Sequence, residues 1–123
     1  MSGERRLRAE GHIYAPVEIE REIARLLEAC DLVITKIAER ARAAAEADAT
    51  YKEKHAKAFL LAEGSVAVRE ALATVDTATE YRDRKIAEAL LLAAQEAGRN
   101  YRSQLDALRS LNTNVRPQAG LNG

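Results

Sequence analysis

The sequence predicts an all-α protein, a long antiparallel helical hairpin of coiled-coil type that assembles with other copies into a helical bundle or ring. Two observations carry this prediction. Of 123 residues, 25 are alanine, whereas only two are proline and six are glycine, a composition typical of long helices. Larger apolar residues also recur at alternating steps of four and three, which is the spacing of a coiled-coil heptad.

The first helix is expected over residues 16–63. Pro16 suits the first turn of a helix, where the missing N–H is tolerated, and no glycine or proline follows until Gly64. The inward-facing stripe is predicted to comprise Ile19, Ile23, Leu26, Cys30, Val33, Ile37, Ala41, Ala44, Asp48, Tyr51, His55, Phe59 and Ala62.

Gly64 and Ser65 form the only strong break inside the pattern. Glycine favours the position just after a helix, and serine is a preferred N-cap for the next one. The second helix is expected to run to about residue 116, with Pro117 ending it. Its predicted inward stripe comprises Val68, Leu72, Val75, Thr79, Arg82, Ile86, Ala89, Ala93, Ala97, Tyr101, Leu105, Leu108, Leu111 and Val115.

Two long helices joined by so short a turn must fold back on each other as an antiparallel hairpin. Charge pairing then predicts the register, since one alignment sets many acidic residues against basic ones. The predicted pairs are Glu28 with Arg102, Asp31 with Arg99, Arg42 with Glu88, Glu46 with Arg84, Asp48 with Arg82, and Lys54 with Asp76.

The resulting organisation is one domain with two appendages. Residues 1–15 are expected to be a flexible basic arm, 16–116 the hairpin with its turn at 64–65, and 117–123 a disordered tail. A single cysteine and the lack of a long apolar run or an apolar signal core favour a soluble, cytoplasmic protein, with no membrane as partner.

The apolar residues outnumber what a lone hairpin can bury. Leucines and isoleucines such as Leu27, Leu32, Ile34, Leu60 and Leu92 lie beside the predicted stripe rather than in it. A further helix must cover them, so we expect the chain to associate with itself as a homo-oligomer.

No residue pattern predicts an enzyme. His12, His55 and Cys30 are far apart in the sequence, and there is no metal-ligand cluster or phosphate-binding glycine loop. We therefore expect no catalytic residue, no metal, no cofactor and no small-molecule substrate.

Charge is balanced overall, with 19 basic and 19 acidic residues, but it is unevenly distributed. Residues 97–123 contain four arginines and one aspartate, and the first ten residues add Arg5, Arg6 and Arg8. In an antiparallel hairpin these segments meet at one basic pole. Such a pole attracts phosphates, and aromatic residues beside arginines can stack nucleic-acid bases. Arg99, Tyr101, Arg102 and Arg109 are the candidates here.

The run Leu105-Asp-Ala-Leu-Arg-Ser110, on a helix after a long Ala/Leu/Glu segment, resembles the C-terminal helix of the UvsY-type recombination mediators of tailed phages. The basic helix that ends at Gly64 also fits their layout, with Lys52, Lys54 and Lys57. The resemblance implies an all-helical ring that binds single-stranded DNA and loads a recombinase in place of single-strand-binding protein. It adds Lys54 and Lys57 to the phosphate-binding candidates.

Two hypotheses of function follow from these patterns. The first is a non-enzymatic phage-type accessory protein of the bacterial host cytoplasm that binds single-stranded DNA, a recombinase or a replication partner. The second is a protein-binding assembly module without nucleic-acid binding, such as a virion scaffold, an adaptor or an inhibitor of a host protein.

Overall fold

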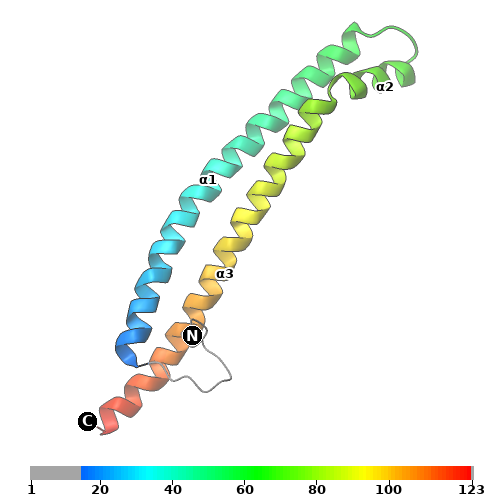
Figure 1. Cartoon of the computed structure of the whole chain (residues 1–123). Coiled ribbons are helices and arrows are strands. Elements are labelled where there is room, and N and C mark those ends of the chain that lie inside the picture. Colours follow the sequence, from blue (N-terminus) through cyan, green and yellow to red (C-terminus); the bar gives the residue numbers. More distant parts are fainter. Residues whose placement is uncertain (1–14, 123) are drawn as a thin grey trace, which may run out of the picture. The chain divides into compact units, whose positions relative to one another are not determined.

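The computed structural model describes residues 15–122, with side chains from 15 to 114, and these residues form three helices. Helix α1 spans Pro16–Leu61, α2 spans Val66–Asp76 and α3 spans Ala78–Asn122 (Figure 1). The expected all-α class is confirmed. The arm predicted over residues 1–15 lies outside the described residues except for Ala15.

The first helix begins where the sequence predicted. Pro16 occupies its first position, and the backbone N–H of Ala15 donates to Glu18 Oε1 at 2.8 Å. This is one half of a capping box, in which an acidic side chain at the third helical position reaches back to the cap. Local chemistry therefore explains why α1 starts at this residue.

The turn between α1 and α2 also lies at the predicted residues. Gly64 has φ +118°, a left-handed conformation that glycine adopts at little cost. Ser65 is the N-cap of α2, and its hydroxyl accepts a hydrogen bond from the Val68 N–H at 3.2 Å. These two residues end one helix and start the next.

The second predicted helix is divided in two, which corrects the prediction of a single helix after the turn. The break is at Thr77, whose side chain is 2% exposed and whose backbone has φ −111° and ψ 23°. The Thr77 hydroxyl donates to the Ala73 carbonyl at 2.7 Å, and the Thr77 N–H donates to the same oxygen. A threonine that bonds back to this carbonyl competes with regular helical bonding and bends the chain.

The end of α3 differs from prediction as well. The helix continues through Pro117 to Asn122, whereas we expected it to stop at the proline. A proline removes one N–H and crowds the preceding turn, which can bend a helix without ending it.

The chain divides into two compact units. Of the described residues, unit 1 contains 15–32 and 98–122, and unit 2 contains Val33–Ala97. Within each unit, segments of α1 and α3 pack side by side in opposite directions, as expected for a hairpin (Figure 1).

Unit 1 has the apolar core that the heptad spacing predicted. Leu26 of α1 is fully buried and packs with Leu105 and Leu108 of α3, while Ile23 and Tyr101 cover this cluster. Ile19 is also fully buried. All six belong to the predicted stripes, so here the sequence pattern and the packing agree.

Unit 2 is packed differently, and the inward stripe predicted for its second helix is wrong. Val68, Leu72, Val75 and Ile86 are exposed, although we expected them to face α1. The residues that turn inward are instead mostly small or polar, with Leu91 the one larger apolar side chain among them. They are Arg69, Ala73, Thr77, Glu80, Arg84, Ala87, Leu91 and Ala94, each of them buried or half-buried.

The polar character of α1 in this unit gives the physical reason. The α1 stripe includes Asp48, Tyr51 and His55, which are all half-buried as predicted. Buried polar groups need partners, and apolar residues on α3 cannot supply them. Arg84 does so for Asp48, with Nε 3.0 Å from Oδ1.

The register of unit 2 is shifted relative to the prediction. Asp48 pairs with Arg84 rather than Arg82, and Lys54 pairs with Glu80 rather than Asp76, at 3.3 Å. The prediction assumed a two-residue turn and one continuous helix. The longer connection over residues 62–65 and the break at Thr77 move the partners further along α3.

Candidate functional site

The six predicted nucleic-acid-binding residues fall in different units. Lys54 and Lys57 lie on α1 in unit 2, whereas Arg99, Tyr101, Arg102 and Arg109 lie on α3 in unit 1. Each group is therefore treated by itself.

The two lysines are already paired with acids. Lys54 Nζ lies 3.3 Å from Glu80 Oε2, and Lys57 Nζ lies 2.9 Å from Glu53 Oε2. Both lysines line an open hollow of about 310 Å³, but Asp76 and Glu80 line it too. Mixed charge of this kind makes the hollow a poor phosphate site, because each acid repels the anion that a lysine attracts.

The carboxylates of these pairs respond to their partners. The pKa of Glu53 lies below its ordinary value, chiefly because the Lys57 ammonium donates a hydrogen bond to it. The pKa of Glu80 is also lowered, first by a backbone N–H bond at Glu80 itself and then by Lys54. Both acids are held in the charged form that neutralises the neighbouring lysine.

Tyr101 belongs to the core of unit 1. Its side chain is half-buried against the cluster of Leu26, Leu105 and Leu108. An aromatic ring that covers leucines has less area left for stacking on a base. The structure therefore places Tyr101 in a packing role, the simpler of its two interpretations.

The three predicted arginines lie on one side of α3. Arg99, Arg102 and Arg109 are all exposed on α3. Steps of three and seven residues place side chains on the same side of a helix. Asp106 lies within this segment and is exposed as well.

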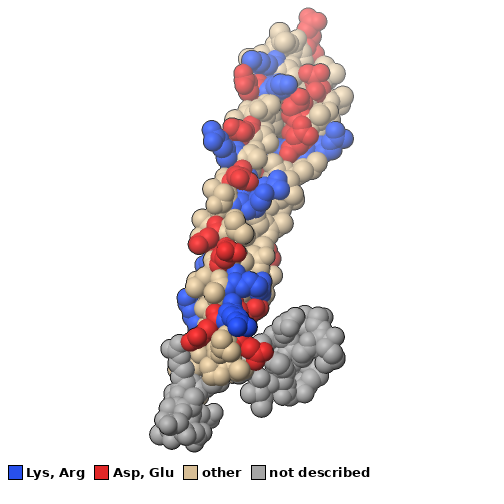
Figure 2. Space-filling view, turned by 60° about the vertical axis from the view of Figure 1, so that its left-hand side comes forward, with Lys and Arg blue, Asp and Glu red and all other residues tan. Residues whose placement is uncertain are grey.

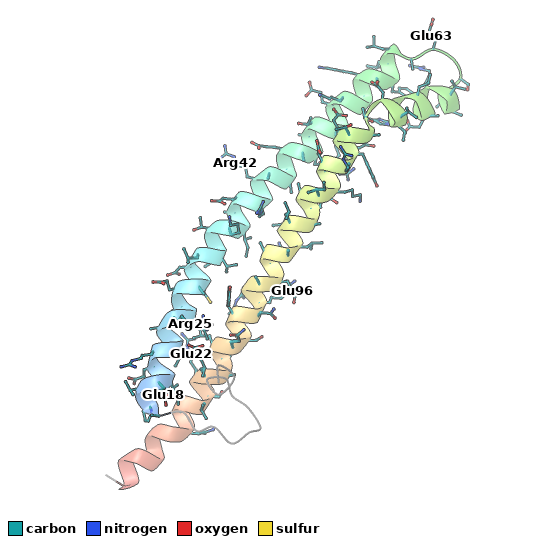
Figure 3. All side chains as sticks on the ribbon, in the orientation of Figure 1. Glu18, Glu22, Arg25, Arg42, Glu63 and Glu96 are labelled. Carbon is teal, nitrogen blue, oxygen red and sulfur yellow. The ribbon has the colours of Figure 1, made fainter. Side chains whose placement is uncertain are left out.

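Basic and acidic side chains alternate elsewhere. Figure 2 shows Lys and Arg interspersed with Asp and Glu on the visible face of each unit. Many of these are partners along one helix, for example Arg25 with Glu22 (Figure 3) and Arg42 with Glu46. The Glu22 carboxylate accepts two bonds from Arg25, at 2.9 and 2.6 Å, and raises the pKa of the guanidinium.

Unit 2 contains a polar interior that the sequence patterns did not reveal. Arg84 Nε contacts both Asp48, at 3.0 Å, and Glu88, at 3.2 Å, and its guanidinium lies 5.2 Å from the centre of the Tyr51 ring. Tyr51 in turn meets Tyr81 edge-on, with ring centres 5.6 Å apart. The sequence signal that could have predicted this polar interior is the set of polar residues within the α1 stripe.

Helix α2 is anchored to α1 by an arginine. Arg69 donates from Nε to the Phe59 carbonyl at 3.2 Å, and its guanidinium lies 4.3 Å from the centre of the Phe59 ring. His55 Nε2 of α1 also lies 3.1 Å from Glu70 Oε1 of α2. These contacts fix which side of α2 faces the rest of unit 2.

The opposite side of α2 is apolar and exposed. Val68, Leu72 and Val75 follow steps of four and three, so they share one side, and they are 48%, 50% and 77% exposed. We call this set the α2 face. Leu61, at the end of α1, is more exposed still, at 84%.

Several kinds of site are missing from the described part of the chain. Among residues 15–122, no group of three or more His, Cys, Asp or Glu side chains could hold a metal ion. No helix in that range is long and apolar enough to cross a membrane.

Comparison with protein-family models, with curated proteins and with solved structures found no match.

Proposed function

We propose that this chain is a protein-binding assembly module that associates with copies of itself. The observation that supports this most is which side chains unit 2 buries and which it exposes. On α2 and on the α3 segment of this unit, most of the buried or half-buried residues are small or polar, such as Ala73 and Arg84, while most of the large aliphatic residues are exposed. A helix that turns its apolar side to water is expected to have a partner.

The exposed apolar residues are numerous for so small a unit. Fully burying a Leu, Val or Ile side chain contributes about 1.5–3 kcal/mol relative to leaving it in water, so even half of that over several residues favours association. The exposed set in unit 2 comprises Ile34, Leu60, Leu61, Val66, Val68, Leu72, Val75, Tyr81, Ile86, Leu90 and Leu92.

Sedimentation velocity over a range from low to high micromolar protein tests this proposal. We expect a species larger than one chain, with dissociation towards the low end of the range. A single chain at every concentration, with a cooperative melt that does not depend on concentration, would contradict it. Such a result would show that the exposed apolar residues need no second copy.

Single-stranded DNA binding is a second candidate function, and it is supported by one observation. Arg102 and Arg109 are exposed along one side of α3 in unit 1, and Arg99, which has an interaction within the chain, lies on the same side. Regularly spaced guanidiniums can contact successive phosphates of a nucleic-acid strand. The lysines of unit 2 add little to this candidate, because acids already pair with them.

A salt series on a fluorescent single-stranded oligonucleotide tests this second candidate. Binding should weaken steeply from about 50 to about 200 mM salt if several phosphates are contacted. The double variant R102Q/R109Q should lose affinity, and Lys57→Gln serves as the matched control because Lys57 is paired with Glu53. No binding at low salt by the assembled protein would rule this function out.

A further inference from the structure

We infer that the α2 face is a self-association surface, on which α2 packs antiparallel to α2 of a second copy about a two-fold axis at Leu72. This inference rests on the proposed self-association and assigns a surface to it. It follows from the anchoring of α2, from the symmetry of its exposed side and from its charges.

The anchoring fixes the orientation of α2. Ala73 is fully buried, Thr77 is 2% exposed and Arg69 is held on Phe59, so these three residues define the inner side. Val68, Leu72 and Val75 must then point away from unit 2. Rotation of α2 to bury them would expose Ala73 and break the two Arg69 contacts.

The spacing of the α2 face suits a two-fold axis. Leu72 is its centre, with one valine four residues before it and another three residues after it. An antiparallel partner with the axis near Leu72 therefore brings Leu72 next to the partner's Leu72. It also brings Val68 next to the partner's Val75, with an offset of about one residue, roughly 1.5 Å along the axis. A surface that is complementary to itself in this way is what a two-fold interface requires.

Small residues beside the face permit close approach. Ala67 and Ala71 are exposed on the flank of the Val68 and Leu72 row. Short side chains let two helix axes come near each other, at the lower end of the 8–10 Å that is usual for packed helices. The row is short, since the 11 residues of α2 span about 16 Å at 1.5 Å per residue, so this pairing should be dissociable.

Charge favours the antiparallel direction. Arg69 and Glu70 contact α1, and Asp76, the third charged residue of α2, lies in its last turn beside the hollow that Lys54 and Lys57 line. An antiparallel pairing keeps the two Asp76 carboxylates at opposite ends of the paired helices. A parallel partner would instead set Asp76 beside the partner's Asp76, and like charges repel.

Disulfide trapping tests the geometry in the full chain with Cys30→Ser as background. Leu72→Cys alone should form a cross-linked dimer. Val68→Cys and Val75→Cys should cross-link when mixed but not separately, because equal positions lie about 10 Å apart along the axis in the antiparallel pairing. Val68→Cys that cross-links with itself as readily as the mixture does would overturn the inference.

A charge substitution provides the second measurement. Leu72→Glu should lose the assembled species in sedimentation while keeping its helix content. Ser103→Glu adds the same charge at an exposed residue of α3 outside the apolar set, and it should keep the assembled species. Persistence of the wild-type oligomer in Leu72→Glu would refute the α2 assignment alone. A wild-type protein that is a single chain at all concentrations would refute self-association itself.

Discussion

Two neighbouring residues of α2 distinguish the observed orientation of this helix from the one that its apolar pattern predicts. Ala73 is fully buried, whereas Leu72 is 50% exposed. Ala73→Leu forces a larger side chain into a packed site, which costs about 1–3 kcal/mol of folding free energy. Leu72→Ala removes apolar area that is already half in water, so we expect a loss of about 1 kcal/mol or less.

The opposite orientation predicts the reverse order. If Leu72 faced α1, Leu72→Ala would leave a cavity and cost about 2–5 kcal/mol, the range for buried leucines. Ala73→Leu would then add an exposed side chain and change stability little. The two orientations thus predict opposite signs for the difference between the free-energy loss in Ala73→Leu and that in Leu72→Ala. This sign can be read even if the absolute losses differ from the values given.

Urea unfolding followed by far-ultraviolet circular dichroism measures both changes. Wild type, Ala73→Leu and Leu72→Ala should be compared at one protein concentration, the lowest at which the wild type is folded, so that changes in association contribute least. A larger loss of stability in Leu72→Ala than in Ala73→Leu would refute the orientation of α2.

Three further substitutions test other parts of the fold. Gly64→Ala should lower the free energy of unfolding by about 1–2 kcal/mol, because Gly64 is left-handed and an added Cβ would lie 3.1 Å from Val68 Cγ1. Thermal melts would show this loss, with Ser65→Gly, which loses only the cap hydroxyl, as the comparison. Leu26→Ala should lower the free energy of unfolding by about 2–5 kcal/mol. Leu32 is 68% exposed on the same helix, so Leu32→Ala should lower it much less. Equal losses in urea titrations would contradict the core of unit 1. The pKa of Glu80 is lower in the folded protein than its ordinary value. Its contribution to stability is therefore complete above the ordinary pKa and is lost as the pH falls through the folded pKa. Stability measured against pH in the acid range should therefore fall less in Glu80→Gln than in wild type, and identical curves would show that Glu80 contributes nothing.

Local signals in the sequence predicted the ends of the elements well where one residue decides the backbone. Pro16 and Glu18 start α1, and Gly64 and Ser65 form the turn. The break at Thr77 was missed because a single threonine lowers helix propensity only slightly and is not a stop signal. Only its burial and its bond to the Ala73 carbonyl make it a bend.

The heptad spacing predicted the core of unit 1 but not that of unit 2. In unit 1, Leu26 and Leu105 are both the most apolar residues available and the ones that meet. In unit 2, the half-buried Asp48 pairs with Arg84 of α3, and most of the large aliphatic residues of α2 and α3 are exposed. A pattern that ranks helix sides by apolarity cannot distinguish a side that packs within the chain from one that packs on another copy.

The predicted phosphate-binding residues were found by charge alone, and this limited their selection. Lys54 and Lys57 have acidic partners that only the fold identifies, and Tyr101 packs on leucines. The three exposed arginines of α3 were predictable because their spacing follows directly from the helix.

The reactivity of a single cysteine at position 72 tests the central claim most directly, namely that the α2 face points away from its own chain and is covered by a second copy. In a Cys30→Ser background, a maleimide should label Leu72→Cys quickly in dilute protein and more slowly as the concentration rises, whereas Ala73→Cys should label slowly throughout. Slow labelling of Leu72→Cys even in dilute, folded protein would place this residue in the chain's own interior and contradict the claim.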